Sequence, residues 1–72
     1  MTFSERLDLL KKASRKIKQE ATGPPEVFAR DLGIPRTNLY RIKLDLEERG
    51  AAIKYDRQRQ TYYFEQGSEP GW

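Results

Sequence analysis

The chain contains neither cysteine nor histidine among its 72 residues. Without cysteine it can form no disulfide and offers no thiolate ligand, which fits a reducing compartment. Without histidine it lacks the commonest metal ligand and the general base best suited to neutral pH. Four tyrosines and eleven carboxylates are present, but the sequence does not group them for acid–base chemistry. We therefore expect a protein that is not an enzyme and that binds no metal and no cofactor.

Long apolar runs are also missing. No stretch approaches the ~20 consecutive apolar residues of a membrane-spanning helix, and the N-terminus lacks the apolar core of a signal peptide. These absences predict a soluble, cytoplasmic protein with no membrane partner. A chain of this length buries only about 60% of its unfolded surface, which leaves little room for a deep substrate pocket. The sequence gives no indication of a small-molecule ligand.

The charge balance is modestly positive, with 14 lysines and arginines against 11 acidic residues. A net charge of +3 is compatible with binding to a polyanion. Many small domains are equally basic and bind no nucleic acid, so the position of the charges matters more than their sum.

The first expected element is a helix that begins near Phe3, because Thr2 and Glu5 have the spacing of a capping box. Its apolar face comprises Phe3, Leu7, Leu10, Ser14 and Ile17, widened by Leu9 and Ala13. A basic stripe beside that face comprises Lys11, Arg15 and Lys18, extended by Lys12 and Lys16. Two interpretations of the stripe remain open: a solvated face that also complements the helix dipole, or a contact with nucleic-acid phosphates.

Residues 21–25 are expected to form a connector, because a glycine and two prolines cannot continue the first helix. A short second helix is expected from Pro25 to about Leu32, with proline at its first position. Gly33 then supplies the left-handed residue that turns the chain into the next helix.

A third helix is expected over residues 36–49. Leu39, Ile42 and Leu46 recur at i, i+3 and i+7, which predicts one buried stripe. The opposite face is basic and polar at its front and acidic at its back, at Asp45, Glu47 and Glu48. Leu44 falls outside the apolar stripe, so we expect it to be exposed.

After Gly50 the period changes from helical to alternating. Ile53 and Tyr55, and then Tyr62 and Phe64, are spaced by two, as in half-buried strands. The polar residues 56–60 between them predict a hairpin, and the aromatic residues of the strands are expected to face the core. Residues 67–72 are expected to form a flexible tail that ends in Trp72, either exposed or folded back on the core.

This order of elements resembles the winged helix-turn-helix domains at the N-termini of DeoR-type and biotin-repressor-type bacterial regulators. The matching segments are residues 27–34, 38–41, 46–50, 53–57 and 62–64. The resemblance implies an α+β winged helix over residues 1–66, in which a three-helix core precedes a two-stranded wing. It also implies sequence-specific binding to double-stranded DNA and a role in transcription regulation.

The chain departs from the family pattern at several positions. Pro35 stands where the family usually has a capping Ser or Thr, and Asn38 stands where Thr is common. Gln58 and Gln60 occupy wing positions that are often glycine. Residues 42–43 are Ile-Lys where the family commonly has Asp-Leu.

The candidate DNA contacts lie on two segments, the front of the third helix and the tip of the hairpin. They are Arg36, Thr37, Asn38, Tyr40, Arg41 and Lys43, together with Arg57 and Arg59. In the major groove Arg36 and Arg41 suit guanine and Asn38 suits adenine. The hairpin arginines would reach the backbone or the adjacent minor groove.

Two questions about partners stay open in the sequence. A specific operator usually engages two modules, so we expect a homodimer on DNA or a partner regulator, with association with the nucleoid. Exposed Leu44 and the acidic half of the third helix keep a protein–protein interaction module as the alternative function.

Overall fold

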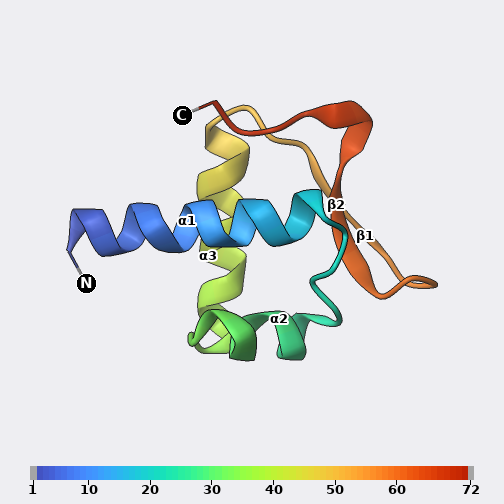
Figure 1. Cartoon of the computed structure of the whole chain (residues 1–72), viewed down its shortest axis with the longest axis horizontal. Coiled ribbons are helices and arrows are strands. Elements are labelled where there is room, and N and C mark those ends of the chain that lie inside the picture. Colours follow the sequence, from blue (N-terminus) through green and yellow to red (C-terminus); the bar gives the residue numbers. More distant parts are fainter. Residues whose placement is uncertain (1, 72) are drawn as a thin grey trace.

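The structure, a computed structural model, describes residues 2–71 and has an α+β fold of helices followed by an antiparallel hairpin (Figure 1). The elements are α1 (Phe3–Lys18), α2 (Pro25–Leu32), α3 (Arg36–Glu48), β1 (Ile53–Asp56), β2 (Thr61–Phe64) and the 3₁₀ turn η1 (Glu65–Gly67). The predicted order and class are confirmed. The helix expected over residues 36–49 ends one residue earlier, and Arg49 caps it.

Local signals define both ends of the short second helix. Pro25 opens α2, at a position where a backbone N–H would have no partner within the helix, so the missing N–H of proline costs nothing. At the other end the N–H of Ile34 donates to the carbonyl of Ala29 at 3.0 Å. The N–H of Gly33, which has a φ of +73°, donates to Arg30 at 3.0 Å. This pair of bonds is a Schellman motif, and it fixes the angle between α2 and α3.

The first helix ends in the same way but without a glycine. Glu20 has a φ of +54°, and its N–H donates to the carbonyl of Ile17 while that of Ala21 donates to Lys16. A left-handed conformation costs a side-chain-bearing residue about 1–2 kcal/mol. The contact made by the Glu20 carboxylate, described below, accounts for a charged residue at this position.

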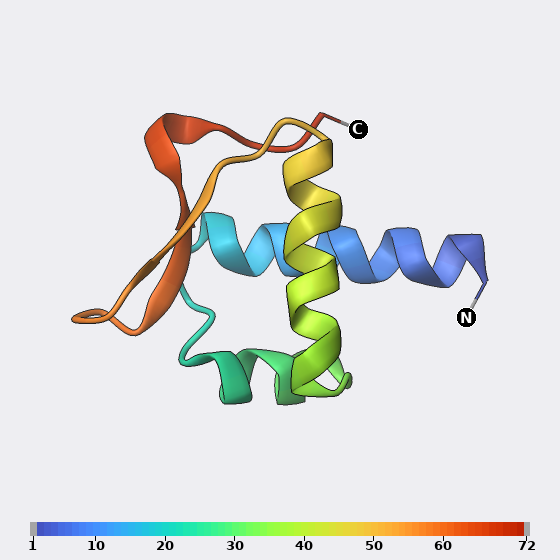
Figure 2. The same cartoon turned by 180° about the vertical axis from the view of Figure 1, so that it is seen from behind.

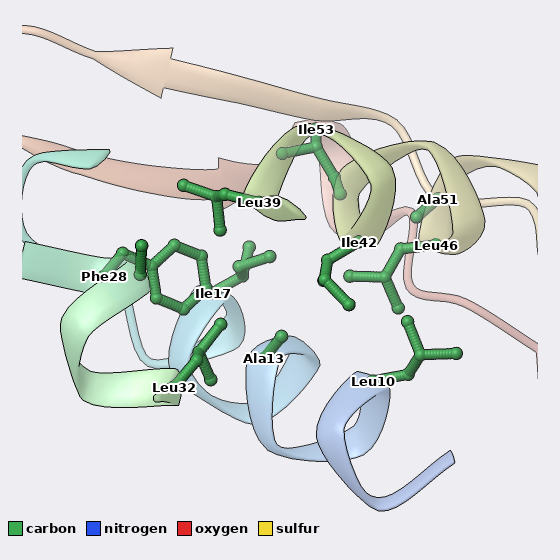
Figure 3. Close-up of a cluster of buried hydrophobic side chains, with 11 residues drawn as sticks. Leu10, Ala13, Ile17, Phe28, Leu32, Leu39, Ile42, Leu46, Ala51 and Ile53 are labelled. Atoms are coloured by element: carbon green, nitrogen blue, oxygen red, sulfur yellow. The ribbon is translucent and has the colours of Figure 1, made fainter. Parts of the chain in front are cut away.

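The hydrophobic core lies where the three helices meet β1 (Figure 3). α3 contributes the predicted stripe of Leu39, Ile42 and Leu46 to it. Its other members are Leu10, Ala13, Ile17, Phe28, Ala29, Leu32, Ala51 and Ile53. α1 crosses α3 on one side, so the opposite side of α3 is left uncovered, and it faces the viewer in Figure 2.

The predicted face of α1 is buried only where α3 covers it. The first turns of the helix project beyond α3 (Figure 1), and Phe3 is 78% exposed. Our assignment of Phe3 to the buried face was therefore wrong. The helical spacing is correct, but α3 crosses α1 near its middle, so the first turns of α1 lie to one side of the crossing (Figure 1).

The two strands pair in an antiparallel register that places Ile53 opposite Phe64 and Tyr55 opposite Tyr62. Tyr62 and Phe64 pack on the core, as expected for inward-facing positions of a half-buried hairpin. The Tyr55 and Tyr62 rings meet edge to face, with 4.8 Å between their centroids.

The connector between α1 and α2 lies along the free edge of β2. The N–H of Tyr62 donates to the hydroxyl of Thr22 at 2.9 Å, and the N–H of Thr22 donates to the hydroxyl of Thr61 at 3.2 Å. Both threonine side chains are buried. The two threonine hydroxyls thus accept hydrogen bonds from the backbone N–H groups of Tyr62 and Thr22. They take the place of the backbone acceptors that a third strand would supply at this edge.

The residues after β2 return to the end of α3. The hydroxyl of Ser68 accepts the N–H of Ala52 at 2.9 Å, and the N–H of Gly71 donates to the carbonyl of Arg49 at 2.8 Å. Pro70 is buried between them. The segment expected to be a flexible tail therefore makes defined contacts up to residue 71. The expectation for Trp72 lies outside the described residues.

Candidate nucleic-acid interface

The uncovered face of α3 changes character along its length. Thr37, Arg41, Leu44 and Glu48 follow one another at i, i+4, i+7 and i+11, and all four are exposed. Leu44 is 40% exposed, as predicted. The face is therefore polar and basic in its first two turns, apolar in the middle and acidic at its end.

The first turn of α3 presents the guanidinium of Arg36. Its Nη1 lies 3.6 Å from Oε1 of Glu26 on α2, and both side chains are largely exposed. Exposed pairs of this kind contribute about 0–1 kcal/mol, so Arg36 can exchange this partner for another anion at little cost. Pro35 caps the helix without a side-chain hydrogen bond, which leaves the exposed Thr37 and Asn38 beside unpaired N–H groups of the first turn.

The second turn adds Tyr40 and Arg41. Tyr40 is 65% exposed, so the ring is not packed against the hairpin. Arg41 is exposed, and Lys43 is half-buried on the side of α3 that faces the hairpin. Behind them, Asp45 forms an ion pair with Arg6 of α1, which ties one of the three acidic residues of α3 to the fold.

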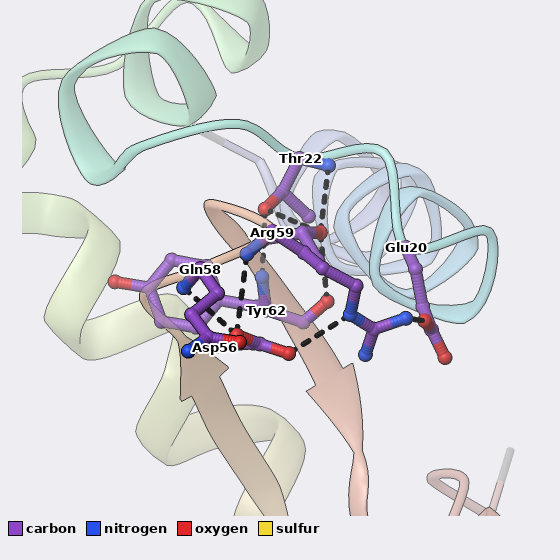
Figure 4. A network of polar contacts seen from close by, with 7 residues as sticks. Glu20, Thr22, Asp56, Gln58, Arg59 and Tyr62 are labelled. Carbon is purple, nitrogen blue, oxygen red and sulfur yellow. Dashed lines mark hydrogen bonds and ion pairs between the residues drawn. The ribbon is translucent and has the colours of Figure 1, made fainter.

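The hairpin tip is built around Asp56. Its Oδ1 accepts the N–H of Gln58 at 2.9 Å and that of Arg59 at 3.2 Å, and its Oδ2 accepts Nε of Arg59 at 2.8 Å (Figure 4). Hydrogen bonding to the Arg59 side chain, with help from the two backbone N–H groups, lowers the pKa of the Asp56 carboxyl. Gln60 closes the turn with a φ of +52°.

Arg59 joins the tip to the end of α1. Its guanidinium also pairs with the carboxylate of Glu20, the left-handed residue that ends α1 (Figure 4). Hydrogen bonds to Asp56 and then to Glu20 raise the pKa of Arg59 above its ordinary value. The guanidinium lies 5.9 Å from the centre of the Tyr63 ring. Arg59 is thus a link within the fold, whereas Arg57 is exposed and makes no ion pair within residues 2–71.

The eight candidate residues fall into two groups, and Arg36, Tyr40 and Lys43 of the first group line a hollow between α3 and the hairpin. The α3 group is Arg36, Thr37, Asn38, Tyr40, Arg41 and Lys43, and the hairpin group is Arg57 and Arg59. The hollow between α3 and the hairpin has a volume of about 200 Å³. Sequence analysis did not predict it, because it depends on how far the hairpin stands from α3.

α1, which carries the basic stripe, lies on the far side of α3 from this face (Figures 1 and 2). Nζ of Lys16 lies 3.9 Å from Oδ2 of Asp31, and Nζ of Lys12 donates to the Asp31 carbonyl at 3.3 Å. Lys18 pairs with Glu69 at 3.2 Å. These contacts favour the first interpretation of the stripe, in which its charges serve the fold and solvation.

The described part of the chain holds no cluster of acidic side chains arranged to bind a metal ion. No helix within residues 2–71 has both the length and the apolar character needed to cross a bilayer.

Comparison with known proteins places the chain in no established group: no family model, no curated protein and no solved structure matches it.

Proposed function

We propose that the chain is a winged helix-turn-helix domain that binds double-stranded DNA sequence-specifically and regulates transcription. α3 enters the major groove, and the hairpin is the wing. The observation that carries the proposal is the uncovered front half of α3, where Arg36, Thr37 and Arg41 are exposed with no acidic residue before Asp45. A helix with this distribution of charge can present its N-terminal half to DNA while its acidic end stays clear of the phosphates.

The side chains of this surface suit different partners in the groove. Arg36 and Arg41 can each donate two hydrogen bonds to guanine, and Asn38 can pair with adenine. Thr37 and Tyr40 suit phosphate oxygens or a thymine methyl group. The exposed methyl groups of Leu44 lie on the same face and can also contact a thymine methyl group.

The two arginines of the wing have different roles in this proposal. Arg57 neutralises a phosphate, and Lys43 does the same beside α3. Arg59 keeps its two carboxylate partners and holds the tip in place. The sequence alone predicted the same role for both arginines, and the distinction between them rests on the Glu20–Arg59 contact.

A binding titration tests the proposal. Labelled protein is titrated with duplex pools at two salt concentrations and followed by NMR. Shifts are expected at residues 36–41 and at the hairpin tip, with affinity that falls as salt rises. Absence of shifts at low salt, or shifts spread evenly over every basic residue, contradicts the proposal.

Charge-loss variants locate the contact once a preferred duplex is known. Arg41→Ala should weaken binding about 5- to 150-fold, the equivalent of the ~1–3 kcal/mol of one base contact. Arg15→Ala is the matched control, because it removes the same charge from an exposed position on α1, behind α3. Equal losses from both variants would show that only total charge matters.

The wing residues separate in the same assay. Arg57→Ala should weaken binding to all sequences alike and reduce the salt slope by about 1. Arg59→Ala should chiefly lower the melting temperature, because it breaks the link to Glu20 and Asp56. The assignment is wrong if Arg57→Ala changes the preferred base and leaves the salt slope unaltered.

An interaction module is the second candidate function, and Leu44 is the observation that favours it. This apolar side chain and Glu48 share the uncovered face of α3. Concentration-dependent shifts around Leu44 without DNA, together with no response to duplexes, would support this function over the first.

A further inference from the structure

The hollow between α3 and the hairpin reaches the hydrophobic core. Its floor includes Phe28, Leu39 and Ile53, whose side chains appear in Figure 3. An engineered cavity of about 150 Å³ lined by Leu, Ile and Phe in another protein binds benzene. At about 200 Å³ this hollow is therefore large enough for a single substituted aromatic ring.

The charged residues around the hollow are of one sign. Arg36 and Lys43 line it from α3, and no acidic residue is among its lining residues within the described chain. The nearest carboxylate contact recorded for these two cations is that of Glu26, which reaches Arg36 from outside the hollow at 3.6 Å. An occupant with an apolar body and one negative charge would complement both parts of the site.

Two tyrosines add hydrogen-bonding capacity beside the cations. Tyr40 and Tyr62 both line the hollow. Burial, followed by the proximity of Tyr55, raises the pKa of the Tyr62 phenol. Its hydroxyl therefore stays protonated and can donate a hydrogen bond at neutral pH.

We infer that this hollow binds a small aromatic monocarboxylate, with the ring beside Tyr40 and Tyr62, above the buried Phe28 and Leu39, and the carboxylate between Arg36 and Lys43. This site was not expected from the sequence. A second part of the inference rests on the proposed function: Arg36, Tyr40 and Lys43 also belong to the proposed DNA surface. The ligand and DNA would then exclude one another, and the ligand would act as a negative effector.

Benzoate is the probe for the first part, used with the full chain and without DNA. NMR shifts should concentrate at residues around Phe28, Leu39 and Tyr62 and saturate with a dissociation constant of about 1 mM, as for a weak ligand of this size. Benzyl alcohol, which has the same ring and no charge, should bind more weakly. Shifts that do not saturate, or that follow surface lysines generally, overturn the site.

Lys43→Met tests the cation, because methionine keeps much of the apolar stem and removes the charge. Benzoate binding should weaken about two- to fivefold, as for loss of one partly exposed ion pair, while benzyl alcohol binding stays the same. Lys54→Met is the matched control, since Lys54 is exposed on β1 and does not line the hollow. Equal effects on both ligands, or from both variants, contradict the role of Lys43.

Competition tests the second part and separates the two proposals. At nine times its own dissociation constant, benzoate should raise the apparent dissociation constant for DNA about tenfold. If benzoate binds but no duplex does, the ligand site is supported and the proposed DNA-binding function is rejected. If DNA binds but benzoate causes no shifts, only the ligand site is rejected. If both bind at the same time, the inference that they exclude one another is wrong.

Discussion

At the scale of single residues, the left-handed positions show how local conformation sets the fold. Gly33 has a φ of +73°, and a Cβ added there would meet no atom within 4 Å. The requirement for glycine is therefore conformational and not steric. Glu20 and Gln60 hold similar conformations with full side chains. At Glu20, the ion pair with Arg59 offsets the free-energy cost of placing a residue with a side chain in the left-handed conformation.

Replacing Gly33 by Ala should lower the free energy of unfolding by about 1–2 kcal/mol, because alanine disfavours the left-handed region by that amount. Urea unfolding followed by circular dichroism measures the change. Gly71→Ala is the control, since the added Cβ would lie 3.7 Å from the carbonyl of Arg49, an ordinary contact. If both substitutions proved neutral, the turn between α2 and α3 would not depend on the conformation of Gly33.

Asp56 makes the hairpin tip sensitive to acid. Hydrogen bonds from Arg59 lower its pKa in the folded protein, so ionised Asp56 stabilises the fold above the ordinary carboxyl pKa of 3.8. That contribution is lost as pH falls through the lowered pKa. The protection of the Gln58 and Arg59 amides from hydrogen exchange, relative to an unstructured peptide at the same pH, should therefore fall below about pH 4.

Asp56→Asn provides the control for this titration. The amide oxygen can still accept the two backbone N–H groups, but the charge that holds Arg59 is absent. In this variant, the protection of the tip amides relative to an unstructured peptide should not change with pH. A variant that kept the acid-dependent loosening would assign it to another carboxylate, such as Glu20.

At the scale of elements, the hairpin is held by the connector as well as by the core. Thr22 and Thr61 supply buried hydroxyls that pair with backbone N–H groups on the opposite segment. Neither segment could make this joint without the other.

Thr22→Val should lower the free energy of unfolding by about 1–3 kcal/mol, because the buried N–H of Tyr62 loses its acceptor. Valine has nearly the same shape, so packing is maintained. Chemical denaturation measures the loss, and Ser68→Ala, which removes the acceptor for Ala52 at a less buried site, gives the comparison. An unchanged stability for Thr22→Val would show that another group or water replaces the hydroxyl.

The sequence predicted the elements well because their signals are local. A capping box at Thr2, a proline at Pro25 and a glycine at Gly33 each act within a few residues, and the structure places helix ends at all three. The stripe of α3 was equally visible in its period.

The site was less predictable because its features join distant segments. Glu20 and Arg59 lie 39 residues apart, and nothing in either neighbourhood indicates that they meet. The hollow likewise requires α3, α2 and the hairpin together. The exposure of Phe3 depends on where α3 crosses α1 and not on the spacing within α1.

At the scale of the whole molecule, the DNA surface that we propose for one domain is small. We expect two copies to bind an inverted repeat, with half-sites separated by about one helical turn. Analytical ultracentrifugation with such a duplex should give a protein-to-duplex ratio of two. A ratio of one on both full and half-sites would contradict this pairing.

The exposed apolar residues suggest where copies would meet. Leu44 lies on the face proposed to contact DNA, whereas Phe3 is exposed in the first turn of α1, the helix that lies behind α3 in Figure 2. Phe3→Ser should therefore reduce cooperativity on the inverted repeat and leave affinity for a half-site unchanged. A loss on both sites would place Phe3 in the fold or in the DNA contact.

The joint between Thr22 and Thr61 also has a consequence for the order of folding. It closes a loop of 39 residues, whereas the turns between consecutive helices close much shorter ones. Long loops cost more entropy to close, so the hairpin should dock on the connector after α2 and α3 have packed together. Loss of the Thr22 hydroxyl would then hasten unfolding far more than it slowed folding. The hairpin would be the first part of the molecule to detach, and the lifetime of this joint would limit how long the two halves of the proposed DNA surface stay aligned.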